Sequence, residues 1–141
     1  MLAHALTEEL ERRGEPPAAL VLIDVYGPSR TAFAGIEERL SGSLSGDADG
    51  LLPADDARLT AMAGYFRLFT GRQPAPLATR TLLVRATEPL AGWSATGDWR
   101  STWADADAVR DTVGDHFSMM EEHADRTAAV VEEWLGSTVD R

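Results

Sequence analysis

The sequence predicts an α/β fold with about three parallel strands. Residues 18–23 form a continuous apolar run, and residues 81–84 place Leu-Leu-Val after a threonine, as expected of strands buried on both faces of a parallel sheet. A weaker run at 108–113 predicts a third strand. Residues with helical periodicity separate the first two runs, as a parallel connection requires.

The first segment is predicted to be an amphipathic helix. Leu2, Leu6 and Leu10 recur every fourth residue, so they are expected to face the core, and Gly14 with two following prolines ends the helix. Met1 opens directly into this pattern without a capping side chain. We therefore expect that this helix is truncated at its N-terminal end.

About fifty residues between the first two strands, 29–78, are predicted to be a helical insertion. Two apolar stripes with helical spacing run through it, and loop-like segments join them. The stripes are Phe33, Ile36, Leu40 and Leu44, then Leu59, Met62, Phe66 and Phe69. An insertion just after the carboxyl end of a strand is typical of a lid.

The lid divides the chain into three parts, with residues 1–28 carrying the first helix and strand and residues 79–141 carrying the other strands and a last helix. That helix is indicated by a stripe of apolar and small residues and is expected to close at Gly136. The stripe consists of Met120, Ala124, Thr127, Val131 and Trp134.

Composition excludes several classes of protein. The 141 residues carry a net charge of −10, spread along the chain, which disfavours nucleic acid as a partner. There is no cysteine, no apolar run long enough to cross a bilayer, and no secretion signal, so no membrane partner and a cytoplasmic location are expected. We find no phosphate-binding glycine loop.

Asp24 and His116 are the candidate catalytic residues. Each follows a predicted strand, and an acid and then a histidine at strand ends is the order of the last two members of an α/β-hydrolase triad. In such a triad the histidine takes a proton from a serine while the carboxylate holds its other ring nitrogen. The alternatives are a turn-capping role for Asp24 and simple packing of His116 against Phe117.

The chain lacks a recognisable nucleophile. A serine nucleophile is expected in Gly-x-Ser-x-Gly, whereas the stretch from Gly42 to Gly46 places Leu44 at the centre and follows a helix rather than a strand. His4 and His123 are expected at the surface, and no spacing suits a metal site.

Several stretches, in order, resemble the terminal thioesterases of modular polyketide synthases, and the likeness covers essentially the whole chain. They are VLIDVYGP at 21–28, DARLTAM at 56–62, LLVRATEPL at 82–90, GDWR at 97–100, Trp103, GDHFSM at 114–119, EHA at 122–124 and WL at 134–135. The resemblance implies the C-terminal half of an α/β-hydrolase fold, incomplete because the strand with the serine precedes it. The sequence departs from the family pattern at Gly27-Pro28-Ser29 and at Ser118.

The resemblance also implies a function. Asp24 is the triad acid, His116 the base, and Tyr26 lines the substrate channel under the lid. A serine in a missing N-terminal half takes a polyketide acyl chain from the phosphopantetheine arm of an acyl carrier protein, without a further cofactor, and water or a hydroxyl of the chain releases it. Alone, this polypeptide is expected to be inactive. The alternatives are a fragment of an editing thioesterase or serine esterase, or a noncatalytic interaction module.

Overall fold

The computed structural model describes residues 1–26, 60–61, 64, 67–68, 73–89 and 99–137. The chain divides into two compact units, one formed by Met1–Gly27 with Pro74–Arg141 and the other by Pro28–Gln73. The described residues at 60–61, 64 and 67–68 are helical, and residues 73–78 form no helix or strand. The rest of the expected lid, including the stripe from Phe33 to Leu44, lies outside the described residues.

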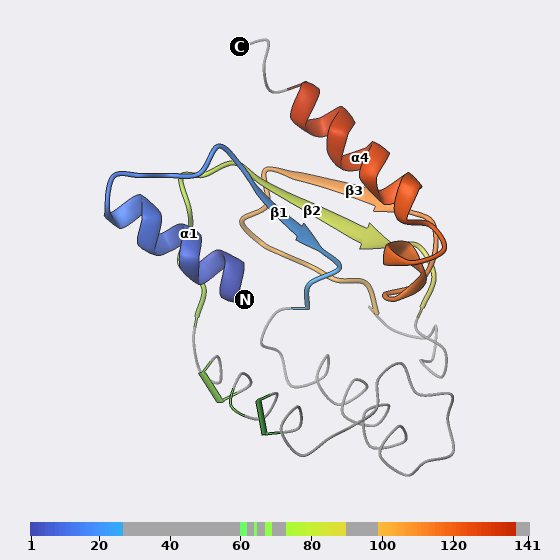
Figure 1. The fold of residues 1–141 in the computed structure, drawn as a ribbon, viewed down its shortest axis with the longest axis horizontal. Coiled ribbons are helices and arrows are strands. Elements are labelled where there is room, and N and C mark those ends of the chain that lie inside the picture. The colour runs from blue at the N-terminus through green and yellow to red at the C-terminus, as the bar shows by residue number, and fades with distance from the viewer. Residues whose placement is uncertain (27–59, 62–63, 65–66, 69–72, 90–98, 138–141) are drawn as a thin grey trace. The chain divides into compact units, whose positions relative to one another are not determined.

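Three parallel strands form the sheet of the first unit, in the order β1 (Leu20–Ile23), β2 (Thr81–Ala86) and β3 (Ala108–Thr112) (Figure 1). Leu20 lies opposite Thr81, and Leu82 lies opposite Ala108. The strand β2 is the central one and is buried at five of its six positions. The predicted α/β class with three parallel strands is therefore confirmed.

Two longer helices and one short 3-10 helix accompany this sheet. They are α1 (Leu2–Arg12), η1 (Ser118–Met120) and α4 (Ala124–Gly136). The last helix begins later than its apolar stripe suggests, and Gly136 is its final residue rather than a cap, since Ser137 follows in right-handed conformation. No helix in the described part of the chain combines the length and apolarity needed to cross a bilayer.

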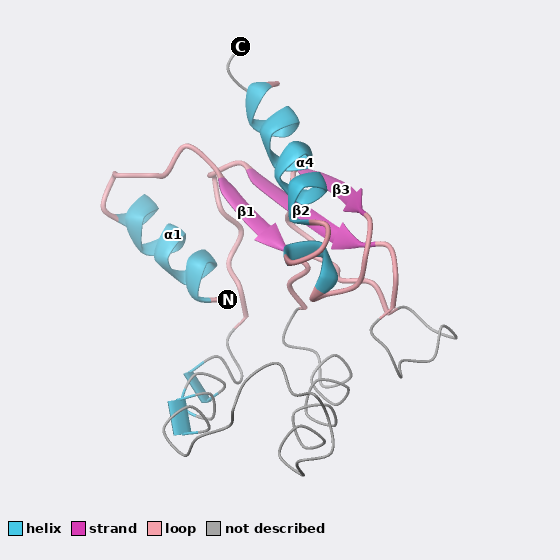
Figure 2. Ribbon diagram, turned by 45° about the vertical axis from the view of Figure 1, so that its right-hand side comes forward, coloured by secondary structure: helices cyan, strands magenta, loops and turns pink. Residues whose placement is uncertain are grey.

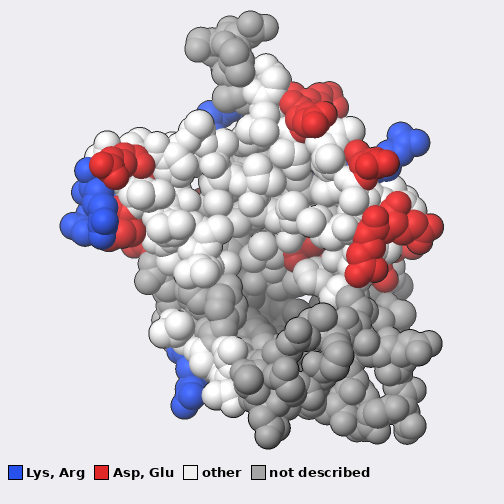
Figure 3. Space-filling view, viewed as in Figure 1, with Lys and Arg blue, Asp and Glu red and all other residues white. Residues whose placement is uncertain are grey.

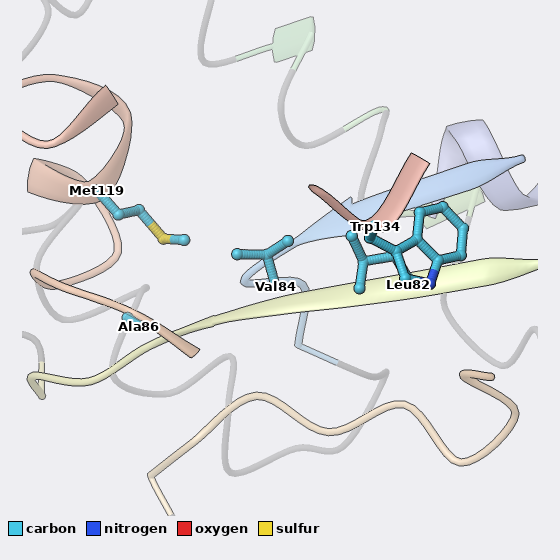
Figure 4. Close-up of a cluster of buried hydrophobic side chains, with 5 residues drawn as sticks. All are labelled: Leu82, Val84, Ala86, Met119 and Trp134. Atoms are coloured by element: carbon cyan, nitrogen blue, oxygen red, sulfur yellow. The ribbon is translucent and has the colours of Figure 1, made fainter. Parts of the chain in front are cut away.

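Side chains on β2 contribute to two apolar clusters. Leu82, Val84 and Ala86 pack with Met119 and Trp134 of the C-terminal region (Figure 4). Leu83 packs instead with Leu20 and Leu22, and Trp103 borders that second cluster. Because successive residues of a strand point to opposite faces, both faces of the sheet are covered, and α4 runs along the first of them (Figure 2).

The helix α1 presents a different face to the sheet than its leucines predict. Leu2 and Leu6 are 60% and 57% exposed, whereas His4 and Thr7 are buried. The His4 ring lies 5.1 Å from that of Trp103, which accounts for its burial and shows that the expected surface position of His4 is wrong.

A hydrogen bond holds the C-terminal end of α1 in place. Glu11 accepts a hydrogen bond from the Thr79 backbone N–H at the approach to β2. His4, Thr7 and Glu11 recur at helical spacing, so one polar side of α1 carries these positions. The orientation of this helix is therefore set by contacts with residues that are distant in the sequence, and helical periodicity does not reveal such contacts.

Candidate functional site

Asp24 directly follows β1 and has an unusual backbone conformation. Its φ is 43°, in the left-handed region that Asp tolerates better than most residues. Its backbone N–H still donates to Val84 O at 2.7 Å, so the pairing with β2 continues through the turn. The carboxylate is 1% exposed, and its Oδ1 accepts a hydrogen bond from the Ala86 N–H at 3.2 Å. The turn thus brings the carboxylate across the end of the central strand.

His116 reaches the same place from the far side of the sheet. It follows β3, and its Nδ1 lies 2.9 Å from Asp24 Oδ2. The His116 side chain is 33% exposed, compared with 1% for Asp24. With Nδ1 directed to the carboxylate, Nε2 is the nitrogen that remains for exchange of a proton with a substrate or nucleophile. The structure brings together the two residues that the sequence singled out.

The loop that carries His116 is held by hydrogen bonds within it. Asp115 Oδ1 accepts from the backbone N–H groups of Phe117 and Ser118 at 3.0 and 2.9 Å and from Ser118 Oγ at 3.0 Å. Ser118 Oγ in turn accepts from the Asp115 N–H at 2.8 Å. This reciprocal arrangement is that of a capping box, and it fixes the backbone on both sides of the histidine.

Gly114 connects the same loop to the sheet. Its φ is +99°, and its carbonyl oxygen accepts from the N–H groups of Thr87 and Glu88 at 3.1 and 3.0 Å. His123 packs against this glycine and is partly buried, so it is less exposed than its expected surface position implies. The loop that carries the base is therefore held by the residues that follow β2 and by the residue that precedes α4.

Two aromatic rings flank His116. The Phe117 ring meets it edge-on at 5.0 Å, and the Tyr26 ring lies 5.8 Å away at 52°. The Tyr26 hydroxyl donates to Asp24 Oδ2 at 3.1 Å, the same oxygen that His116 uses. Tyr26 is thus in direct contact with the candidate acid.

The environment favours an ionised Asp24. Burial acts most strongly and raises the pKa of this carboxyl, but the hydrogen bonds from His116 and Ala86, the nearby Ser101 hydroxyl and the charge of His116 together bring the pKa below its ordinary value. Burial raises the pKa of Tyr26, and so does the negative charge of Asp24. The charged Asp24 carboxylate can therefore accept hydrogen bonds from the protonated Tyr26 hydroxyl and from His116. The second of these bonds orients the imidazole.

Sequence reasoning missed three contributors to this site. Asp115 and Ser118 have a sequence signal, because Asp-x-x-Ser is a spacing at which two side chains can cap each other. Ser101 has none: it lies in an irregular segment before β3 and is 0% exposed. Among the described residues, no three His, Asp or Glu side chains gather where they could hold a metal ion. The stretch Gly42–Gly46 lies outside the described residues.

Comparison with known proteins identifies the family of this chain. Residues 1–135 match the family model of the thioesterase domain. The chain is 41% identical over 145 residues to polyketide synthase GfsE of Streptomyces halstedii and 40% identical over 137 residues to erythronolide synthase EryA3 of Saccharopolyspora erythraea. It is 38% identical over 138 residues to the spectinabilin polyketide synthase system protein NorC of Streptomyces orinoci.

These matches cover nearly the whole chain but little of the relatives. They span 96%, 96% and 95% of this chain and 4%, 4% and 6% of the three synthases. A match over residues 1–135 includes both Asp24 and His116. On this evidence the chain belongs to the thioesterase domain family and resembles the thioesterase domains of modular polyketide synthases.

Proposed function

We propose that this chain supplies the acid and the base of a chain-releasing polyketide thioesterase. The observation that carries the proposal is the 2.9 Å contact between Asp24 Oδ2 and His116 Nδ1 at the carboxyl ends of β1 and β3. In a thioesterase family member, a buried carboxylate on the Nδ1 side of a histidine has the geometry of a triad without its serine.

The reaction is acyl transfer in two steps. A serine outside these 141 residues gives its proton to His116 Nε2 while its oxygen attacks the thioester carbonyl, and the thiol leaves with a proton returned by His116. In the second step His116 deprotonates water or a hydroxyl of the acyl chain, whose oxygen attacks the serine ester, and His116 then returns the proton to the serine oxygen as the ester bond breaks. Water gives a carboxylic acid, and an internal hydroxyl gives a macrolactone.

The partners follow from this chemistry. The acyl chain arrives on the phosphopantetheine arm of an acyl carrier protein, and no other cofactor is needed. The half of the domain that holds the serine is the second partner. Tyr26, next to the acid, lines the channel through which the acyl chain passes, and residues 29–78 form its lid.

The 141-residue chain is proposed to be inactive alone. It contains no Gly-x-Ser-x-Gly, and in hydrolases of this kind one oxyanion-hole donor is the N–H that follows the serine. Without a nucleophile, Asp24 and His116 have no group to activate.

The test combines this chain with a separately made first half of a related thioesterase domain that carries the serine. Hydrolysis of a short acyl thioester is expected only in the mixture. We expect Asp24→Asn and His116→Ala to lower kcat/KM by about 10³-fold or more, as loss of a triad member does. Asp105→Asn, which changes an exposed carboxylate, should leave the rate unchanged.

Two outcomes would count against the proposal. Hydrolysis by the isolated chain would contradict its inactivity, and a folded mixture that stays inactive would favour a noncatalytic interaction module.

A further inference from the structure

A buried carboxylate needs hydrogen-bond donors to stay charged. Asp24 is 1% exposed, and its burial opposes ionisation. The reaction proposed above, on which this inference rests, needs Asp24 ionised while His116 is still neutral. In that state His116 donates one hydrogen bond but carries no charge, so the carboxylate depends on other donors.

The structure supplies one donor from the backbone and one from a side chain. The Ala86 N–H donates to Oδ1 at 3.2 Å, and the Tyr26 hydroxyl donates to Oδ2 at 3.1 Å. Because Oδ2 also receives His116 Nδ1, the phenol and the imidazole share one oxygen. These contacts fix the carboxylate at both oxygens, which sets the direction that it offers to the histidine.

Ser101 is the third neighbour. It is 0% exposed, and its hydroxyl helps to lower the pKa of Asp24. Its Oγ is buried and has no hydrogen-bond partner among the described residues. A buried hydroxyl with no better acceptor than this carboxylate gains most by donating to it.

We propose that Tyr26 and Ser101 are positioning residues, which keep Asp24 ionised and oriented toward His116. The role of Tyr26 then extends beyond lining a channel. Ser101 acts from the segment before β3, so that segment contributes to the site although it holds neither the acid nor the base.

Among the described residues, the titratable groups in hydrogen-bond contact with the carboxylate are His116, from the loop after β3, and Tyr26, from the segment after β1. Asp115, also from the loop after β3, acts on Tyr26 through its charge. The strand β2 contributes the uncharged Ala86 amide, and the segment before β3 contributes the Ser101 hydroxyl. Loss of either hydroxyl therefore leaves the carboxylate with one donor fewer.

The experiment is a pH titration of aspartate carboxyl carbons by NMR in the 141-residue chain. The Asp24 signal is identified by its loss in Asp24→Asn. We expect Tyr26→Phe and Ser101→Ala each to move the Asp24 titration to higher pH, because each removes a donor to the charged form. Ser137→Ala is the matched control: the Ser137 hydroxyl donates to Trp134 O at the end of α4, and its loss should leave Asp24 unchanged.

An Asp24 titration that stays at the wild-type pH in both variants would overturn the proposal, and a shift in only one would overturn the role of the other residue. Phenylalanine fills the space of Tyr26, so that variant carries the test even if Ser101→Ala unfolds. The measurement needs no acyl transfer, which separates this inference from the proposed activity: an inactive mixture with shifted titrations would refute only the latter.

Discussion

Gly114 is the residue on which the position of the base depends most directly. Its φ of +99° lies in a region that side chains with a Cβ avoid. A Cβ at this position would also lie 2.7 Å from Ser118 Oγ and 2.8 Å from His123 Cδ2. The first of these atoms belongs to the capping box around His116, so a side chain here displaces the loop that holds the histidine.

Gly114→Ala is expected to cost more stability than Gly14→Ala. Both glycines have positive φ, but no atom lies within 4 Å of a Cβ added at Gly14. Backbone strain alone costs about 1–2 kcal/mol, and overpacking adds roughly 1–3 kcal/mol at Gly114. Urea unfolding of both variants measures the difference in free energy. Equal losses would show that the loop around Ser118 yields to the added methyl group.

At the scale of single elements, sequence patterns predicted the strands better than the helices. The first two strands are readable because nearly every position in them is apolar: β2 is the central strand and is almost fully buried, and β1 alternates buried and partly buried residues. The third was weaker because Val109, Arg110 and Asp111 are exposed. Its end still placed His116 opposite Asp24, because parallel strands end at the same edge.

The helix α1 was misread for a physical reason. Helical periodicity identifies an apolar face but does not show which surface the helix packs against. Here His4 packs against Trp103, and Glu11 accepts a hydrogen bond from a backbone N–H. Ser101 was missed for the same reason, because it acts on Asp24, which lies 77 positions earlier in the sequence (101 − 24). Contacts between distant segments leave no local pattern.

The orientation of α1 predicts the effect of two matched substitutions. His4→Ala removes a ring that is 1% exposed, and we expect a loss of about 2–3 kcal/mol. Leu6→Ala removes a side chain that is 57% exposed, and the change should stay within about 0.5 kcal/mol. Urea unfolding compares the two. A larger loss for Leu6→Ala would mean that the leucine face, and not the histidine face, meets the sheet.

At the scale of the whole molecule, acidic residues outnumber basic ones by ten (23 − 13). The described acidic side chains on the face in Figure 3 form several separate groups rather than one patch. On this face the acidic groups repel one another without gathering into one strongly negative patch. As the pH falls from 7, protonation of ordinary carboxylates relieves this repulsion, while carboxylates with lowered pKa values lose stabilising contacts.

Asp24 is expected to dominate the acid side of the stability curve. Hydrogen bonds from Arg12 and Arg13 lower the pKa of Glu9 to about 2, but that pair is exposed and contributes little. Asp24 is buried, and its pKa is lower in the folded chain than in the unfolded chain. Its contribution is therefore complete above the unfolded value, about 3.9, and is lost as the pH falls through the folded value.

Urea unfolding between pH 7 and pH 3 in high salt, which screens the net charge, tests this assignment. We expect wild type to lose stability on acidification more steeply than Asp24→Asn, because the variant has no carboxylate left to protonate there. The variant should be less stable at pH 7, and the two curves should begin to converge as the pH falls below about 3.9. Asp105→Asn should follow the wild-type curve. Parallel curves for wild type and Asp24→Asn would mean that folding does not stabilise the charged form of Asp24, and the acid–base pairing with His116 would then lack its energetic basis.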